Sequence, residues 1–475
     1  DAKNNEPLPF TNIVIYGTNI GATSDLDGYF SFTGLEPGYM RLAATSIGFE
    51  DYISEDILVT NAKSVFIQIP MIEKAVQLEE VVVKASPFRR VEESPISMRS
   101  LDISEIEKNP GGNRDISKVI QSLPGVSTTV SFRNDVIVRG GGANENSIYL
   151  DDIEIPTINH FSTQGASGGP IGIINVDFIR EVDYYSGAFP ASKGTNLSSV
   201  FEFKMIEPNT EKLNFRGTVG ASDLGLSVNG PITKNSGLLL SVRRSYLGFL
   251  FNVLGLPFLP TYNDIQVKYK WKINKKNQIS FIGLGAIDQF ELNTGLKDPD
   301  ESQAFLLRAL PVNEQWSYTA GIVYKHFRDK GFDTWVISRN YLDNRAYKYF
   351  NNVEVDSMKI YDYLSTEAEN KLRYEHLSRV NGYKITYGAG INYAQYTNST
   401  FQQVYNESSQ VIDYDSKLDL FSYNVFGQVS KSIFRDRLTL SLGARMDANN
   451  YTPHMANLLN QISPRFSASV GIVEG

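Results

Sequence analysis

The sequence contains no cysteine, few histidines and no long apolar run. Without cysteine, a disulfide framework, a thiolate metal site and a cysteine nucleophile are all excluded. No segment approaches the roughly 18 apolar residues that a membrane-spanning helix requires, so a helical membrane protein is excluded too. Basic residues are outnumbered, because 45 Lys and Arg stand against 53 Asp and Glu and give a formal net charge of −8. A nucleic-acid partner would need a basic stripe to neutralise phosphates, and we find none.

Catalytic and metal-binding patterns are missing as well. The four histidines, His160, His326, His376 and His454, are scattered, and we expect each to be a surface or loop residue. No HExxH, GxSxG or Walker pattern occurs. Acidic groups at 298–301 and 413–419 lack the spacing of a calcium loop and are expected to be solvated loop charge. The sequence predicts no enzyme, no metal and no cofactor.

Aromatic residues are plentiful, with 26 Tyr and 27 Phe. From about residue 198 onward the chain offers roughly a dozen alternating segments, for example 264–271, 316–327 and 383–396. Transmembrane strands alternate lipid-facing and lumen-facing side chains, so a mild mean hydropathy of −0.23 is compatible with them. Turns also alternate between short ones, such as 275–277, and long polar ones, such as 293–302. These features are compatible with an antiparallel barrel in this part of the chain.

The first 75 residues form a separate unit. Strand-like runs at 12–16, 29–32, 40–45, 57–60 and 65–69 predict a small sandwich. Its most specific signal is the stretch 24–32, where a Gly-containing turn leads to Phe30 and Phe32 on one face. This stretch resembles the carboxypeptidase regulatory-like domain. The unit contains no histidine, so the resemblance implies a binding or spacer module and no zinc peptidase.

The chain is organised around the stretch 136–156, VIVRGGGANENSIYLDDIEIP. Turn residues Asp151 and Asp152 predict a hairpin that continues into the run 153–155. The glycines at 140–142 could cradle a phosphate, but no Gly-Lys-Ser/Thr and no helix follow, so a nucleotide site is rejected. The stretch looks like the plug core of TonB-dependent outer-membrane transporters, in which an Arg-Gly pair, here Arg139-Gly140, precedes a hydrophobic run ending in an aspartate, here Asp151.

Two further sequence segments resemble the same family. Residues 113–123 predict a helix that has Asp115 near its start and apolar residues on one face, and it ends in Leu-Pro-Gly-Val at 123–126. Residues 177–204 end in an alternating strand, 198–204, which in the family begins the barrel. The resemblance covers about 78–204. Asp152 stands where many relatives have glycine, which leaves the turn type open.

Residues 77–85 lead into three consecutive valines. On their own they predict an ordinary interdomain strand. Their place before a plug resembles the Ton box, which a periplasmic coupling protein captures by strand addition. The resemblance assigns this role to Glu79, Glu80, Val81, Val82 and Val83.

The resemblance implies a mainly β fold with four parts: an N-terminal β-sandwich (1–75), a Ton box and linker (76–85), a mixed α/β plug domain (86–197) and an antiparallel transmembrane β-barrel (198–475). Family barrels have about 22 strands, whereas this chain supplies about 14. An open sheet edge in lipid is costly, so we expect that the native chain continues or that part of it is missing here. A complete smaller barrel is the alternative.

The implied function is active import of a specific ligand through the outer membrane, with the N-terminal domain in the periplasm. Implied partners are a TonB-type coupling protein, outer-membrane lipid, an external ligand (an iron chelate, vitamin, glycan or peptide) and a surface lipoprotein. The alternative is a non-transporting surface β-rich binding protein. Candidate ligand-facing residues at the plug apex, which could equally be ordinary loop residues, are Phe132, Arg133, Asn134, Asn159, His160 and Phe161. Arg139 is expected to be buried and paired with a carboxylate such as Glu202.

Overall fold

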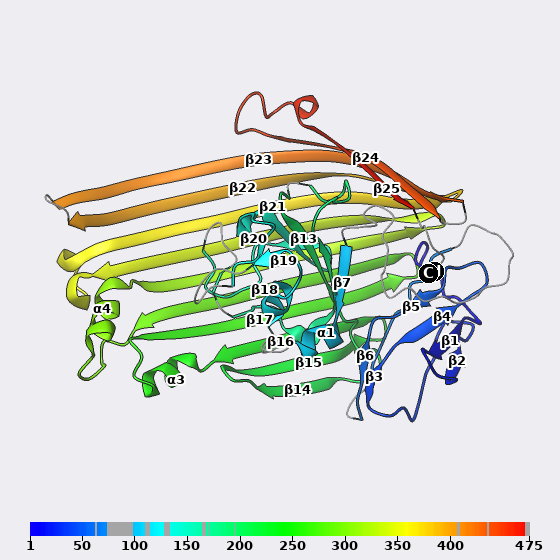
Figure 1. Ribbon diagram of the computed structural model, residues 1–475, viewed down its shortest axis with the longest axis horizontal. Coiled ribbons are helices and arrows are strands. Elements are labelled where there is room, and N and C mark those ends of the chain that lie inside the picture. Colours follow the sequence, from blue (N-terminus) through cyan, green and yellow to red (C-terminus); the bar gives the residue numbers. More distant parts are fainter. Residues whose placement is uncertain are drawn as a thin grey trace.

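The computed structural model describes residues 1–61, 64–73, 98–109, 115–127, 134–163, 168–169, 171–194, 196–405, 409–434 and 437–470. These residues form an N-terminal β domain, a central domain and a curved antiparallel sheet of 12 strands, which we call the wall (Figure 1). The central domain lies against one face of the wall, which we call the inner face. The prediction of a mainly β chain with a mixed α/β domain and an antiparallel sheet is confirmed.

The N-terminal domain has two small sheets around its own core. The first has the order β2 (Gly21–Thr23), β1 (Asn12–Ile15), β4 (Leu42–Thr45), β5 (Tyr52–Ile53), and the second pairs β3 (Gly38–Met40) with β6 (Ile57–Val59). The predicted strands at 29–32 and 65–69 are wrong, because these residues join no ladder. Phe30 and Phe32 nevertheless pack edge to face, with ring centres 6.1 Å apart, against the core around Ile13 and Met71. The alternation of Phe30 and Phe32 therefore reflects packing in the core and not hydrogen bonding in a sheet.

The central domain is built on a five-stranded sheet with the order β11, β10, β13, β12, β7. Its elements are β7 (Met98–Asp102), α1 (Ile103–Lys108), α2 (Ile116–Gln121), β8 (Val126–Ser127), β9 (Ile137–Val138), η1 (Ala143–Glu145), β10 (Asn146–Leu150), β11 (Ile153–Ile155), η2 (Val176–Phe178), β12 (Ile179–Tyr185) and β13 (Ser199–Met205). Asp115 caps α2 as expected, because its side chain accepts a hydrogen bond from the backbone N–H of Ser117 at 2.9 Å.

The hairpin at Asp151 and Asp152 is confirmed: β10 and β11 pair in antiparallel fashion around these two residues. Both have positive φ, 44° and 74°, as a two-residue type I′ turn requires. This conformation favours glycine, asparagine or aspartate. An aspartate at 152 is therefore compatible with the turn.

One strand assignment is wrong. The segment 198–204 was expected to open the barrel, but from residue 199 it belongs to β13, which lies between β10 and β12 in the central sheet. Its side chains Val200, Phe201 and Phe203 are buried in the central core. An alternating segment looks the same in either sheet, so periodicity alone could not place it. The wall begins at Asn214.

The wall strands follow one another in chain order. They are β14 (Asn214–Val219), β15 (Asp223–Thr233), β16 (Ser236–Ser245), β17 (Phe258–Asn274), β18 (Asn277–Leu292), β19 (Val312–Arg328), β20 (Gly331–Tyr349), β21 (Lys359–Val380), β22 (Tyr383–Tyr405), β23 (Ser409–Ile433), β24 (Leu438–Asn449) and β25 (Ile462–Val470). β15 was not predicted, because its two glycines and a proline obscure the alternation.

The two ends of the wall differ. At one end the connections are brief, such as 275–276, 329–330 and 381–382, and we call this the short-turn end. The opposite, long-loop end carries α3 (Leu247–Val253), α4 (Glu301–Ala309), η3 (Phe350–Asn352), η4 (Asp356–Met358) and η5 (Leu458–Asn460). The N-terminal domain lies at the short-turn end, where the side-chain amide of Asn5 donates to the carbonyl of Lys275 at 3.0 Å (Figure 1).

The central domain contacts the inner face partly through apolar groups. Its residues Ile148, Leu150 and Ile153 share one buried core with wall residues Ile282, Leu284, Val323 and Val336. The approach is close at Gly321, where an added Cβ would lie 2.5 Å from Cδ1 of Ile153. Glycine at this position lets the hairpin reach the backbone of β19.

Candidate functional site

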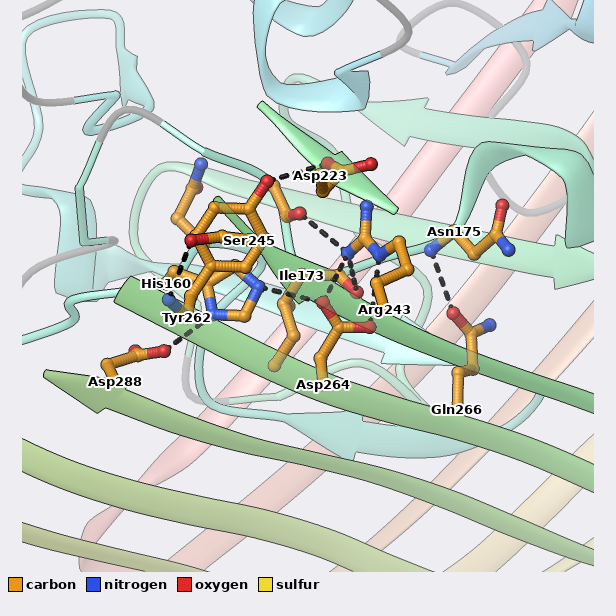
Figure 2. A network of polar contacts seen from close by, with 12 residues as sticks. His160, Ile173, Asn175, Asp223, Arg243, Ser245, Tyr262, Asp264, Gln266 and Asp288 are labelled. Carbon is orange, nitrogen blue, oxygen red and sulfur yellow. Dashed lines mark hydrogen bonds and ion pairs between the residues drawn. The ribbon is translucent and has the colours of Figure 1, made fainter. Parts of the chain in front are cut away.

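A buried polar cluster joins the central domain to the inner face (Figure 2). His160 is 1% exposed, and its ring lies between two wall carboxylates. Nδ1 is 2.7 Å from Oδ1 of Asp288 on β18, and Nε2 is 3.0 Å from Oδ2 of Asp264 on β17. A carboxylate can only accept, so both ring nitrogens must donate, and the imidazole is a cation.

The surroundings of His160 favour this charged form. Burial alone would lower the pKa of His160, but Asp288 and Asp264 outweigh burial and raise it to about 9. The ring of Tyr262 lies over the imidazole with centres 4.4 Å apart and covers it from one side. At neutral pH the cluster therefore holds a charged, doubly hydrogen-bonded histidine.

Arg243 on β16 completes the cluster. Its guanidinium contacts Asp264 through Nε at 3.0 Å and Nη2 at 2.9 Å. Nη2 also donates to the carbonyls of Gly172 and Ile173 in the central domain, at 2.9 and 2.8 Å. Two cations and two carboxylates thus balance one another, which is the condition for burying charge at tolerable cost.

The acidic turn of the β10–β11 hairpin makes a second polar contact with the wall. The carboxylate of Asp151 lies 2.7 Å from Nζ of Lys268, and that of Asp152 lies 2.8 Å from Nζ of Lys325. Arg373 donates to the backbone carbonyl of Asp152 at 2.8 Å. Burial would raise the pKa of Asp152, but Lys325 and Arg373 hold it well below its usual range. Asp152 is therefore ionised, and the carboxylates of both residues are paired with lysines of the wall.

A cavity of about 240 Å³ opens beside this turn. Its lining is dominated by charged side chains of both signs from the central domain and the wall: Asp151, Asp152, Arg180, Glu202, Lys204, Glu207, Lys268, Lys270 and Lys325. Most of these charges are already paired, for example Lys270 with Glu207 at 2.6 Å. The cavity is therefore a polar gap between two parts that meet through ion pairs.

A third contact fixes the segment that follows β12. Arg465 on β25 donates to the carbonyls of Phe189 and Pro190 at 2.6 and 2.7 Å. The backbone N–H of Ala191 donates to the side chain of Gln428 on β23 at 2.6 Å. Side chains of β14, β16 to β21 and β23 to β25 thus contact the central domain.

The expectation for Arg139 is wrong. Its side chain is exposed, it donates to the hydroxyl of Ser186 at 3.1 Å, and its backbone has a positive φ of 52°. Glu202 instead pairs with Lys193, whose ammonium also lies 4.0 Å from the centre of the Tyr149 ring. Arg139 and Gly140 form a loop with positive φ at both residues, so the pair shapes the backbone.

The expected ligand-facing residues divide into three groups. Asn134, Asn159 and His160 are wrong as exposed loop residues, because all three are at most 1% exposed. Asn134 contacts Lys118, and Asn159 donates to Ser117 at 3.2 Å, so both serve interior hydrogen bonding. Phe161 is partly exposed and stays a candidate. Phe132, Arg133 and the Ton box residues 79–83 lie outside the described residues.

Sequence reasoning missed the inner-face cations. Lys268, Lys325, Lys371 and Arg373 were not singled out, although each occupies an alternate position of a predicted strand next to an outward apolar or aromatic residue. Glu154 on β11 pairs with Lys371 at 3.1 Å, which extends the series. A count of charges at inward positions of the strands could have found them. Within the described ranges, no group of three or more His, Asp or Glu side chains could hold a metal ion.

Comparison with known families decides what the first two parts are. A CarboxypepD_reg-like domain model matches residues 1–83, and a TonB-dependent receptor plug domain model matches residues 90–199. The chain combines a carboxypeptidase regulatory-like domain with a TonB-dependent receptor plug. The central domain is hereafter the plug. A TonB-dependent receptor of Formosa agariphila is 25% identical over 306 residues, which are 62% of this chain and 28% of that protein.

Solved structures share the fold at low identity. A variant of the ferric enterobactin receptor of Pseudomonas aeruginosa matches with TM-score 0.59 and 14% identity over 81% of this chain and 60% of its own. The siderophore receptor PirA of Acinetobacter baumannii gives 0.58 and 14% over 82% and 61%. The outer membrane transporter YddB of Escherichia coli gives 0.55 and 14% over 78% and 58%. The chain thus spans about three fifths of the length of these structures.

Among the residues that the structure describes, no helix is long and apolar enough to cross a membrane.

Proposed function

We propose that the protein imports a ligand across the outer membrane, with the plug closing the passage along the inner face of the wall. The observation that carries this proposal is the asymmetry of the wall: its inner face binds the plug through charged groups, and its outer face is apolar. Exposed outer-face residues at alternate strand positions include Ile265, Phe281, Ile322, Ile337, Leu372, Ile391, Val425, Leu442 and Phe466. A lipid-facing surface has this composition.

Aromatic residues border the apolar band on both sides. Towards the long-loop end Trp316, Tyr318 and Tyr341 form one cluster, with ring centres 4.8 to 6.0 Å apart. Towards the short-turn end Trp335 contacts Tyr374, with ring centres 4.5 Å apart, in the row of Tyr324. Trp316 and Tyr324 are eight residues apart on β19, about 26 Å at 3.3 Å per residue. At the usual strand tilt of about 40° this length is about 20 Å in height, which is of the order of the roughly 25 Å apolar band between aromatic girdles.

The polar attachment suits a plug that moves. Ion pairs and hydrogen bonds can be exchanged for water when the plug shifts, whereas a wholly apolar interface would expose its surface. The gap beside Asp151 and Asp152 already separates plug and wall. Movement of this hairpin would open a polar route along the inner face.

Short turns of such barrels face the periplasm. Because the N-terminal domain lies at the short-turn end, this rule supports a periplasmic location for that domain. The Ton box segment 79–83 lies at the C-terminal end of the stretch that the regulatory-like domain model matches, just before the plug in sequence. Capture of this segment as an added strand would let the coupling protein pull on the plug.

Uptake measured in Val82→Pro cells tests the active part of this proposal. Proline removes a backbone donor and blocks a ladder, so energy-dependent uptake should be lost while ligand binding to intact cells is kept. Val82→Ala, which keeps the donor, is the matched control and should transport normally. Normal accumulation by Val82→Pro cells would exclude the Ton box assignment.

The competing function is a non-transporting surface protein. The need for detergent distinguishes the two functions, because a protein with an apolar, lipid-facing wall stays dispersed only with detergent. Monodisperse purified protein in detergent-free buffer would favour the competitor.

A further inference from the structure

The inner face of β21 to β23 continues beyond the plug towards the long-loop end. Lys371 marks this face, because it pairs with Glu154 of the plug. At every second position of β21 beyond Lys371 the inner face carries Glu369, Glu367, Ser365, Tyr363 and Tyr361. The register places Tyr396 of β22 opposite Glu367, and it places Thr400 between Tyr363 and Tyr414 of β23. Four tyrosines and two glutamates therefore line one continuous surface.

Several of these groups have no partner among the residues that the structure describes. The carboxylate of Glu367 and the hydroxyls of Tyr361 and Tyr414 form no hydrogen bond or ion pair with any described residue. Glu369, in contrast, accepts from Asn340 and Tyr396, each at 3.3 Å, and pairs with Lys371 at 2.9 Å. Unsatisfied acceptors and donors that face an open passage are available to a ligand.

The tyrosine rings present flat apolar surfaces beside these polar groups. Tyr361 and Tyr363 lie nearly parallel, at 7°, with ring centres 6.4 Å apart. Tyr414 is 50% exposed. Such rings offer an apolar face and a polar tip in one side chain.

The neighbouring cations are all engaged. Nζ of Lys348 donates to the carbonyls of Leu307 and Leu310 at 2.6 and 2.7 Å. Lys359 pairs with Asp362 at 3.0 Å. Among the described residues, Lys348 has all three N–H groups bound to oxygens and Lys359 is paired, so neither lysine offers an anionic ligand a free donor. Such a ligand would also meet the carboxylate of Glu367, which disfavours binding.

We propose that this surface binds the imported ligand through an uncharged, polyhydroxylated part, that is, a saccharide. The proposal rests on the proposed import function and names its ligand class. Ring C–H faces of a sugar pack on the tyrosines, and its hydroxyls donate to Glu367 and exchange hydrogen bonds with the hydroxyls of Tyr361 and Tyr414. A neutral sugar also avoids the charge conflict that an anionic metal chelate would meet.

The test is calorimetric binding by the purified full chain in detergent. The probes are neutral hexasaccharides of glucose, xylose and mannose, a cationic and a neutral hexapeptide, and ferric enterobactin as an anionic chelate. We expect at least one hexasaccharide to bind, and Tyr363→Ala and Tyr414→Ala to raise its Kd at least tenfold. Tyr393→Ala, on the outer face of β22, is the matched control and should leave Kd unchanged.

Three results would overturn the proposal: binding of the chelate or a peptide with every hexasaccharide inert, no binding of any hexasaccharide, or equal losses in Tyr393→Ala and Tyr414→Ala. Binding in detergent needs neither a membrane nor a coupling protein. Failure of the saccharide assignment is therefore separate from failure of import, which the Val82→Pro uptake experiment reports.

Discussion

His160 of the plug is joined to one carboxylate oxygen of Asp288 on the wall, and the backbone of the residue after it is joined to the other oxygen. The imidazole Nδ1 lies 2.7 Å from Oδ1, and the backbone N–H of the next residue, Phe161, donates to Oδ2 at 2.7 Å. A single wall side chain thus fixes both the ring and the main chain of a plug loop. Because the opposite ring nitrogen contacts Asp264, the loop is attached to two neighbouring strands.

Replacement of His160 should loosen the plug. His160→Ala leaves Asp288 without its cation and Asp264 with Arg243 alone, and removal of one partner from a buried ion cluster costs about 3–5 kcal/mol. We expect a lower thermal unfolding midpoint in detergent and faster proteolysis of the plug. His454→Ala, in an exposed loop, is the control. Unchanged midpoint and proteolysis in His160→Ala would contradict a fixing role.

The same cluster predicts a dependence on pH. The pKa of His160 is raised to about 9 in the folded protein, against about 6.5 when unfolded. Its stabilising contribution is therefore complete below pH 6.5 and is lost as pH rises through 9; the full shift corresponds to roughly 3 kcal/mol. The difference in unfolding free energy between wild type and His160→Ala should shrink from pH 6 to pH 10. A constant difference would mean that the ring is not protonated.

The pair Asp152 and Lys325 should be energetically coupled. Asp152→Asn keeps a residue that tolerates the positive φ of 74° while removing the charge. Lys325→Met keeps the apolar stem. In a double-mutant cycle on unfolding free energy we expect a coupling of about 0.5–3 kcal/mol. Additive effects would show that the 2.8 Å contact does not bind the hairpin to the wall.

Gly321 should be intolerant of a larger side chain. A Cβ there would meet Cδ1 of Ile153 at 2.5 Å and Cβ of Ser338 at 2.9 Å, so Gly321→Val must displace the hairpin. Overpacking of this kind costs about 1–3 kcal/mol. Gly427→Ala, where no atom lies within 4 Å of the added Cβ, is the control. Equal thermal unfolding midpoints for the two variants would argue against close contact at Gly321.

Local patterns in the sequence predicted those features that depend on local chemistry. The Asp115 cap, the Asp151–Asp152 turn and the alternating wall segments all follow from residues close in sequence. Which strands pair with one another could not be predicted from these local patterns. β13 and the wall strands alternate alike, yet β13 pairs in parallel with β10, a contact across some 50 residues. Periodicity tells which faces differ and says nothing about which strand lies alongside.

The site was predicted least well, for a related reason. His160 looks like any loop histidine until Asp264 and Asp288, more than 100 residues away, are brought to its ring. Arg139 looked like a buried cation because of its neighbours in sequence, whereas the positive φ at 139 and 140 turns it outward. Burial of a charge depends on the approach of distant strands, and a single sequence does not reveal that approach.

The length of the middle strands sets where a ligand would first be met. β22 has 23 residues and β23 has 25, although about 9–11 suffice to cross a bilayer. From Tyr393, an exposed aromatic residue on its outer face, β22 runs a further twelve residues to Tyr405, about 40 Å along the strand and about 30 Å in height at the usual tilt. That height is several times the Debye length of about 8 Å in physiological salt. The first encounter with a ligand at the long-loop ends of β22 and β23 should therefore be insensitive to the charge of the lipid headgroups.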